Sequence, residues 1–245
     1  MVDATRRNIL LAGATAMTAA AVPNAWGFTV PAAEAAALVP IPVIDCPAGS
    51  SPARASAQAE PGRLALLIRQ AGRRYTKAGL RLADARTRAW ASTLASPYAA
   101  EIRALAADLG QPGAFLLNYS YEWGCTAGAV PGRQGGATLL RTLDWPFDGL
   151  GRALIVTRRE SGAGRYLSAT WPGFAGVLTG LAPGRFAAAI NQPPLPLPGW
   201  GKPIGWLAAR WQAERSHAMP PEHLLRLAFE TAADFAEAAA LILRT

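Results

Sequence analysis

The stretch that decides the fold reads GCTAGAVPGRQGGATLLRTLDWPF, residues 124–147. Its middle, Pro-Gly-Arg-Gln-Gly-Gly, is typical of a turn. This turn separates two runs of strand-forming residues, Thr126–Val130 and Ala137–Leu143. Because the link between the runs is too short for a crossover, the stretch predicts an antiparallel β-hairpin.

The register of this hairpin decides which side chains meet. A hairpin centred on Arg133 would place Cys125 opposite Arg141, with Asp144 three residues further on, beside the start of the first strand. A slip of one residue would turn the side chains to the other face. With the centred register, we expect a thiol, a guanidinium and a carboxylate at one end of the hairpin.

Cys125, Arg141 and Asp144 suit nucleophilic catalysis. A thiolate is the competent nucleophile, a nearby cation favours it, and a carboxylate can hold that cation or orient an amine. The usual histidine base is missing from this stretch, since both histidines of the chain lie far downstream. The α-amino group of Cys125, released by cleavage of the Gly124–Cys125 bond, would be another base. From spacing alone, an inert cysteine beside a surface ion pair is the more common outcome.

The rest of the chain falls into three blocks. Residues 27–60 are rich in Ala, Pro and Ser and predict an extended lead-in. Apolar residues at helical spacing then predict helices from about Gly62 to Ala71, at Leu80–Leu94 and at Pro97–Leu109. Beyond Ala114 we expect strands at Thr126–Val130, Ala137–Leu143, Ala153–Arg159, Arg165–Thr170, Gly176–Leu181 and Phe186–Ile190, and then helices at Ile204–Ser216, at Pro221–Phe229 and from about Ala232. This order predicts the α+β class, with helices packed against antiparallel sheet.

The N-terminus has the features of an export signal. Arg6 and Arg7 precede an apolar, Ala-rich run that ends near Val22, which is typical of a twin-arginine signal. The run is short and rich in Ala and Thr for a bilayer span, although a membrane anchor or a helix of the fold are alternatives. We expect cleavage after Ala21 or Ala25, residues 1–25 outside the fold, and a periplasmic or secreted protein.

Composition narrows the possible partners. Hydrophobic residues make up 51% of the 245-residue chain and charged residues 16%, which indicates a globular protein with a sizeable core. The net charge is +8, but the arginines look scattered, so we expect no nucleic-acid partner and leave a negatively charged surface or substrate open.

Cys46 and Cys125 are too few for a cysteine-based zinc site or a disulfide framework. His217 and His223 lie in no metal motif and are interpreted as ordinary helix residues, so we expect no metal and no cofactor.

Three blocks of sequence resemble one family of enzymes. The first is LNYSYE at 117–122, shortly before Cys125, and the second is LRTLDWPF at 140–147. The third is PGFAGVLTG at 172–180, followed by PGRF at 183–186 and Ile190-Asn191-Gln192. In this order and spacing they resemble the acid ceramidase and N-acylethanolamine-hydrolysing acid amidase family, which are cysteine N-terminal-nucleophile hydrolases.

The resemblance implies a fold and a mechanism. It implies an αββα fold and a precursor that cuts itself between Gly124 and Cys125. Residues 26–124 would remain as a helical α subunit, associated with residues 125–245 as a β subunit. Cys125 would be the nucleophile and its new amine the base, with Arg141 and Asp144 beside it. The substrates would be N-acyl amides with apolar acyl chains, cleaved through a thioester, and transient contact with a membrane surface would fit such substrates.

The chain departs from the family in two places. The family has a Glu near Gln192, so a carboxylate is missing there. Members also continue past the point where this sequence ends, so we expect a fold that is incomplete at its C-terminus. Asn191, Gln192, Trp145 and Trp171 are candidate substrate or oxyanion contacts, although aromatic residues at such spacing are more often core.

Two other functions stay open at this point. A truncated relative could keep the fold and bind lipid or a partner chain without turnover. The same scaffold could instead hydrolyse bile salts or penicillin V. All three interpretations use Cys125, so that residue alone does not separate them.

Overall fold

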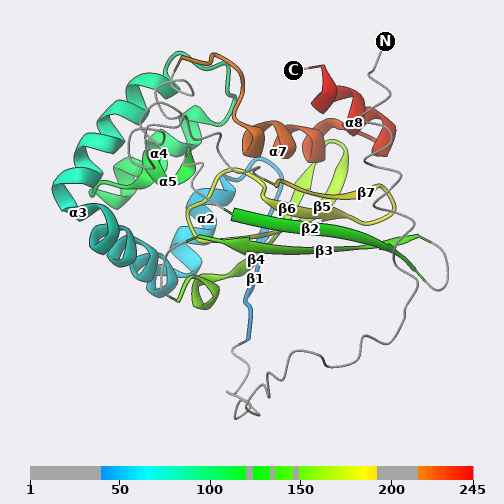
Figure 1. The fold of residues 1–245 in the computed structure, drawn as a ribbon, viewed down its shortest axis with the longest axis horizontal. Coiled ribbons are helices and arrows are strands. Elements are labelled where there is room, and N and C mark those ends of the chain that lie inside the picture. Colours follow the sequence, from blue (N-terminus) through cyan, green and yellow to red (C-terminus); the bar gives the residue numbers. More distant parts are fainter. Residues whose placement is uncertain (1–39, 120–123, 133–135, 146–148, 192–214, 245) are drawn as a thin grey trace, which may run out of the picture. The chain divides into compact units, whose positions relative to one another are not determined.

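The computed structural model describes residues 40–119, 124–132, 136–145, 149–191 and 215–244, which belong to one compact unit, Pro40–Thr245. The predicted export signal, Gln192 and most of the predicted helix at 204–216 lie outside the described residues. Figure 1 shows the arrangement of the helices and strands. No helix among the described residues is long and apolar enough to cross a membrane.

A five-stranded sheet forms the centre of the described unit. Its strands lie in the order β1-β4-β5-β6-β7, and they are Val43–Cys46, Ile155–Ser161, Gly164–Thr170, Thr179–Ala182 and Phe186–Ala189. β1 runs parallel to β4, and the other neighbours are antiparallel. The α+β class is therefore confirmed, but the sheet is mixed rather than wholly antiparallel.

The predicted hairpin is present as a separate two-stranded sheet. β2 is Gly124–Pro131 and β3 is Ala137–Asp144, and the two strands are antiparallel. Figure 1 shows this long ribbon crossing in front of the larger sheet. The predicted hairpin that carries Cys125 and Arg141 is therefore confirmed.

Six α-helices surround the strands in the described residues: α2 (Pro52–Ala59), α3 (Pro61–Ala91), α4 (Ala99–Leu109), α5 (Ala114–Asn118), α7 (Pro221–Thr231) and α8 (Phe235–Leu243). A short 3₁₀ turn covers Leu150–Ala153. α3, α4 and α5 lie together at one end of the strands (Figure 1). α7 packs on the larger sheet, where Phe229 stacks between Tyr166 of β5 and Phe186 of β7.

Helix α3 is one element with a break, where the sequence predicted two helices. Thr76 has φ 62° and ψ 159°, a conformation that residues other than glycine rarely adopt. Its hydroxyl accepts a hydrogen bond from the Gly79 N–H at 3.2 Å. Thr76 thus acts as an N-cap for the second half of the helix. The gap between the two predicted helices falls at this break.

Two predictions in the first half of the chain are wrong. Residues 27–60 contain β1 and α2 rather than only an extended lead-in. α2 begins with Ser51, whose hydroxyl accepts from the Arg54 N–H, and with Pro52 in its first turn. These are ordinary helix-start signals, hidden by a composition that resembles a loop. α5 likewise occupies residues where the sequence indicated the beginning of strand structure.

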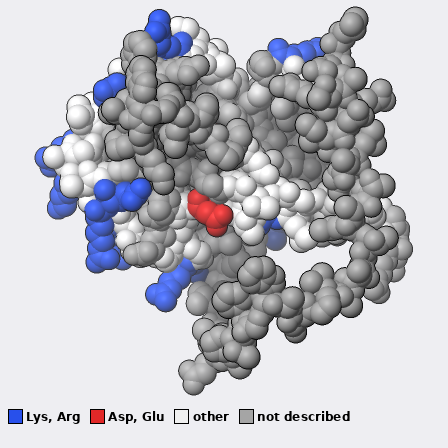
Figure 2. Space-filling view, in the orientation of Figure 1, with Lys and Arg blue, Asp and Glu red and all other residues white. Residues whose placement is uncertain are grey.

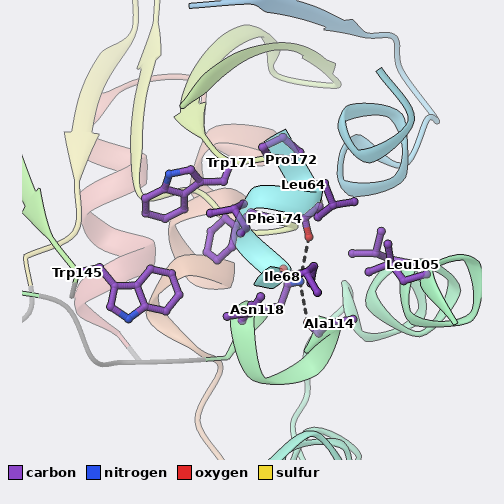
Figure 3. Close-up of a pocket in the computed structure, with 13 residues that line it drawn as sticks. Leu64, Ile68, Leu105, Ala114, Asn118, Trp145, Trp171, Pro172 and Phe174 are labelled. Atoms are coloured by element: carbon purple, nitrogen blue, oxygen red, sulfur yellow. Dashed lines mark hydrogen bonds between the residues drawn. The ribbon is translucent and has the colours of Figure 1, made fainter. Parts of the chain in front are cut away.

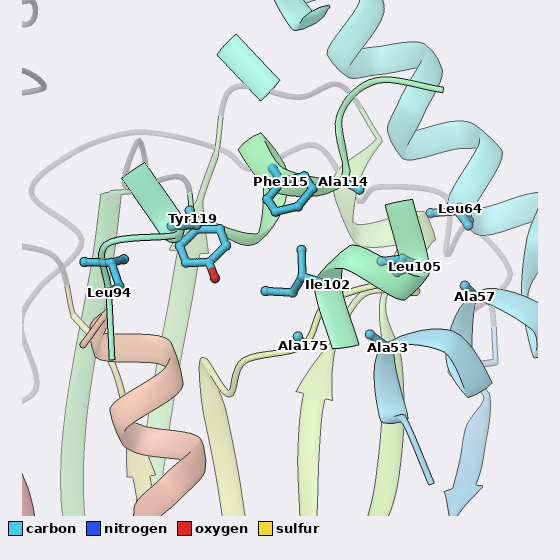
Figure 4. Close-up of a cluster of buried hydrophobic side chains, with 11 residues drawn as sticks. Ala53, Ala57, Leu64, Leu94, Ile102, Leu105, Ala114, Phe115, Tyr119 and Ala175 are labelled. Atoms are coloured by element: carbon cyan, nitrogen blue, oxygen red, sulfur yellow. The ribbon is translucent and has the colours of Figure 1, made fainter. Parts of the chain in front are cut away.

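The core has helix–helix and helix–sheet parts. Figure 4 shows the cluster between α2, α4 and α5, in which Ile102, Leu105 and Phe115 are almost fully buried. A second cluster joins Leu67 and Leu80 of α3 to aromatic residues near the hairpin, and a third lies between α7 and the sheet. The second cluster therefore packs a helix that precedes Cys125 against residues that follow it.

A buried ionic network lies between α4 and α7. Arg226 contacts Glu101 at 2.6 Å and Glu230 at 2.7 Å, and its guanidinium lies 3.9 Å from the centre of the Tyr98 ring. Tyr98 and Tyr166 both donate to the Glu230 carboxylate. Every charge in the network has an opposite charge beside it, which is the condition for burying such groups.

Candidate active site

The observed register of the hairpin differs from the predicted one. Cys125 pairs with Leu143, and Arg141 pairs with Ala127, so the prediction that Cys125 faces Arg141 directly is wrong by two positions. The turn is centred one residue later than Arg133, because Pro131 pairs with Ala137. A slip of two residues leaves side chains on the same face, since their direction alternates with period two. Cys125 and Arg141 are thus diagonal neighbours on one face.

Arg141 contacts the thiol and holds the hairpin against the larger sheet. Its Nη2 lies 3.2 Å from Cys125 Sγ and donates to the Ile190 carbonyl at 3.0 Å. Its Nη1 donates to Thr179 Oγ1 at 3.1 Å. Thr179 begins β6 and Ile190 follows β7, so residues far apart in sequence fix this guanidinium. The sequence predicted neither of them, because hairpin-to-sheet contacts leave no local pattern.

No carboxylate balances Arg141 among the described residues. The guanidinium is half-buried, and its Nε is buried without a hydrogen-bond partner. Burial lowers the pKa of Arg141, and the Cys125 thiol opposes that shift only in part. An arginine in this setting gains electrostatic stabilisation if the sulfur beside it becomes negative.

Asp144 lies next to the site in register, but its side chain is more exposed than that of Arg141. It pairs with Gly124, the residue before Cys125. Its side chain is exposed, whereas Arg141 and Leu143 are half-buried, which follows the alternation along β3. Within the described part of the chain, no ion pair joins Asp144 to Arg141. Two of the three predicted groups therefore meet through side chains, and Asp144 flanks the backbone at the Gly124–Cys125 bond.

An apolar pocket of about 910 Å³ opens beside Arg141. Asp144, Trp145 and Trp171 line it, together with aliphatic residues of β3 and of the 3₁₀ turn. Trp145 and Trp171 are almost fully buried, and their ring centres are 5.7 Å apart. Cys125 packs against the same apolar cluster. The two tryptophans named as candidate contacts thus belong to the core and also form a pocket wall.

A smaller cavity of about 30 Å³ lies behind these tryptophans (Figure 3). Figure 3 shows Trp145, Trp171 and Phe174 on one side, with Leu64 and Ile68 of α3 among the other lining residues. Asn118 seals it through hydrogen bonds to the carbonyls of Ala114 and Gly173, both at 2.9 Å. Helix α3 therefore forms part of the apolar wall that adjoins the candidate site.

The remaining candidates are less closely tied to the thiol. Asn191 is exposed and directly follows Ile190, the carbonyl that Arg141 holds. His223 lies in α7, as expected of a helix residue, and is buried, and burial lowers its pKa to about 3. His217 lies outside any helix, so its placement in one is wrong. Among the described residues, no group of three or more His, Cys, Asp or Glu side chains could hold a metal ion.

Comparison with known proteins adds no family name to this geometry. No protein-family model matches the chain, and no curated protein matches it significantly.

Proposed function

We propose that this chain is an N-terminal-nucleophile amide hydrolase of the αββα type, with Cys125 as the nucleophile. The observation that carries the proposal is the 3.2 Å contact between Cys125 Sγ and Arg141 Nη2, at the start of a strand and beside an apolar pocket of about 910 Å³. Arg141 has no carboxylate partner among the described residues, and such a cation next to a thiol suits a reactive cysteine better than a structural one. The three blocks of family-like sequence surround the same residues.

The first proposed step is self-cleavage. Cys125 Sγ attacks the carbonyl carbon of Gly124, the C–N bond to Cys125 breaks, and the new amine takes the thiol proton. Water then hydrolyses the Gly124 thioester and leaves a carboxylate on Gly124 and a free thiol and amine on Cys125. Among the described residues, Asp144, opposite Gly124 in the ladder, is the carboxylate nearest in register to the new amine.

The second proposed step is turnover of an N-acyl amide. The amine of Cys125 accepts the thiol proton, the sulfur attacks the acyl carbonyl carbon, and the leaving amine departs with that proton. Water hydrolyses the thioester and releases the acid. Arg141 stabilises negative charge on the sulfur in this scheme, and Thr179 with Ile190 keeps its guanidinium in place.

The pocket supports an apolar acyl group as the part of the substrate that binds. Trp145, Trp171 and aliphatic side chains form most of its wall, and Arg141 stands at the edge of this apolar surface. The usual size of small-molecule pockets is about 300–1,000 Å³, so this one suits a chain or a ring system. The structure favours neither a fatty acyl chain nor the bulkier acyl groups of bile salts and penicillin V.

Self-cleavage provides the direct test. We expect the purified protein to give two fragments on a denaturing gel, with mass spectrometry placing the cut between Gly124 and Cys125. Cys125→Ala should stay intact. Cys46→Ala is the matched control, because Cys46 is the other free cysteine, is buried in β1, and should leave cleavage unchanged.

A second measurement separates hydrolysis from binding. An acylating inhibitor should label Cys125 in the processed protein, and N-acyl substrates should release acid. A single intact band together with an unlabelled Cys125 would overturn the proposal and favour a lipid- or partner-binding relative. Comparing fatty acyl amides with a bile-salt conjugate and penicillin V would then identify the substrate class.

A further inference from the structure

Helix α3 gathers most of the chain's excess positive charge on its outer surface. Eight basic residues and one acidic residue give α3 a formal charge of +7, against +8 for the whole chain. Seven of the basic side chains are exposed: Arg69, Arg73, Arg74, Lys77, Arg81, Arg86 and Arg88. We call this set the basic face of α3. Figure 2 shows Lys and Arg side chains spread along the α3 side of the molecule.

Five of the seven cations of the basic face form no ion pair within the described part of the chain. Asp84, the acidic residue of α3, is buried and accepts a hydrogen bond from the Leu116 N–H, so it does not balance the surface. Arg69, Arg73, Arg74, Lys77 and Arg81 form no ion pair with any described residue. Unpaired charges of one sign along one helix create a field that attracts an anionic surface.

The residues between the charges favour a flat lipid surface over a nucleic acid. Leu82, 66% exposed, lies next to Arg81. The exposed Ala78, Ala85 and Ala89 add only short side chains to the same surface. A large aliphatic side chain between cations suits the boundary between phospholipid headgroups and acyl chains. Nucleic-acid surfaces instead combine cations with exposed aromatic residues for stacking, and no aromatic residue of α3 is exposed.

The inner face of the same helix adjoins the candidate site. Leu64, Leu67 and Ile68 of α3 line the cavity that Trp145 and Trp171 also line. We propose that the basic face of α3 docks the protein on an anionic phospholipid surface. Docking would hold the molecule where an amphiphilic N-acyl amide is concentrated, with the other side of the docking helix forming part of the apolar interior next to Cys125. This benefit rests on the proposed function, but the docking itself does not.

Vesicle binding tests the inference without requiring turnover. We expect the full chain to sediment with vesicles that contain phosphatidylglycerol, to ignore pure phosphatidylcholine vesicles, and to dissociate as salt is raised. Arg73→Gln/Arg81→Gln should weaken binding about 25-fold, since one cation near an anionic membrane contributes about fivefold. Arg158→Gln/Arg165→Gln removes the same charge from exposed positions of β4 and β5, and this matched control should change binding less than about twofold.

Several results would overturn the inference. Equal loss of binding in the two double variants would show that only net charge matters. Equal binding to both kinds of vesicle would show that charge is irrelevant. Tighter binding to duplex DNA, with the same dependence on Arg73 and Arg81, would reassign the face to a nucleic acid. Thermal unfolding of each variant checks that the fold is retained, and Cys125→Ala should bind vesicles as well as wild type, so failure of docking is distinguishable from failure of catalysis.

Discussion

Arg226 and Arg141 are both arginines, but their electrostatic surroundings differ. Arg226 is buried between Glu101 and Glu230; burial alone would lower its pKa, but the two carboxylates outweigh burial, and the pKa is raised. Arg141 is half-buried against a thiol, a hydroxyl and a carbonyl, and its pKa is lowered by burial. Arg226 therefore has its full set of opposite charges, whereas Arg141 has no carboxylate beside it among the described residues. This difference separates an arginine that stabilises the fold from the one to which we assign a chemical role in the proposed function.

The largest expected effect is on the structural arginine. Arg226→Met leaves the partly buried Glu101 and Glu230 without their counter-charge, so we expect the free energy of unfolding to fall by about 3–5 kcal/mol. Chemical denaturation would measure this loss. Arg165→Met is the control, because its ion pair with Glu160 is exposed and should contribute no more than about 1 kcal/mol. Equal losses in the two variants would contradict the contrast.

The next effect should fall on activity. Arg141→Met removes the cation beside Cys125 Sγ, and we expect hydrolysis to slow about 10²–10³-fold, as for the loss of one group that stabilises developing charge. The free energy of unfolding should fall by no more than about 1–3 kcal/mol, the range for leaving a buried polar group unsatisfied. Kinetics and denaturation on the same preparation check both numbers. If Arg141→Met lost as much stability as Arg226→Met, or kept full activity, the proposed difference between the two arginines would be wrong.

We also expect the region around α7 to be packed more tightly than the hairpin. A Cβ added at Gly180 would lie 2.6 Å from the Phe229 ring of α7, so Gly180→Ala should destabilise the protein by about 1–3 kcal/mol. A Cβ added at Gly128 in the hairpin would meet nothing within 4 Å. Gly128→Ala should therefore change the melting temperature very little. Similar shifts for the two variants would mean that the hairpin is packed as tightly as α7.

The smallest effect is a dependence on pH that arises in α7. Burial raises the pKa of Glu222 from 4.5 to about 8, so the native state retains a proton and stability falls as pH rises through that range. Burial lowers the pKa of His223 from 6.5 to about 3, so stability falls as pH drops through that range. We expect stability to be greatest between about pH 4.5 and 6.5, with slopes of at most about 1.4 kcal/mol per pH unit.

Two variants separate the two sides of that pH profile. Glu222→Gln should flatten the fall in stability at higher pH, and His223→Gln should flatten the fall at lower pH. Denaturation midpoints across the pH range would measure both. If the stability of the wild-type protein did not change between about pH 4 and 8, the two side chains would be more hydrated than their buried positions in α7 imply, and the prediction would be wrong.

The sequence predicted what depends on local patterns and missed what depends on distant ones. The Pro-Gly-rich turn sufficed for the hairpin. The predicted pairing of Cys125 with Arg141 is wrong, but the two side chains still lie on one face because the register differs by an even number of residues. The parallel pairing of β1 with β4 and the contacts of Arg141 with Thr179 and Ile190 join distant segments, so no local pattern encodes them. The basic face of α3 contradicts the expectation of scattered arginines: residues 61–91 hold eight basic residues and one acidic residue, a local excess that a count over the whole chain does not show.

The parallel strand β1 has a consequence for a processed molecule. Val43–Cys46 precedes Cys125 in the chain, yet it pairs along Val156–Arg159, which follow it. Cutting the Gly124–Cys125 bond would leave two polypeptides sharing one sheet, held by a hydrogen-bonded ladder as well as by side-chain packing. Refolding of such a molecule from denaturant becomes a reaction between two chains, with a rate that rises with protein concentration, whereas an uncut Cys125→Ala chain refolds at a rate independent of it.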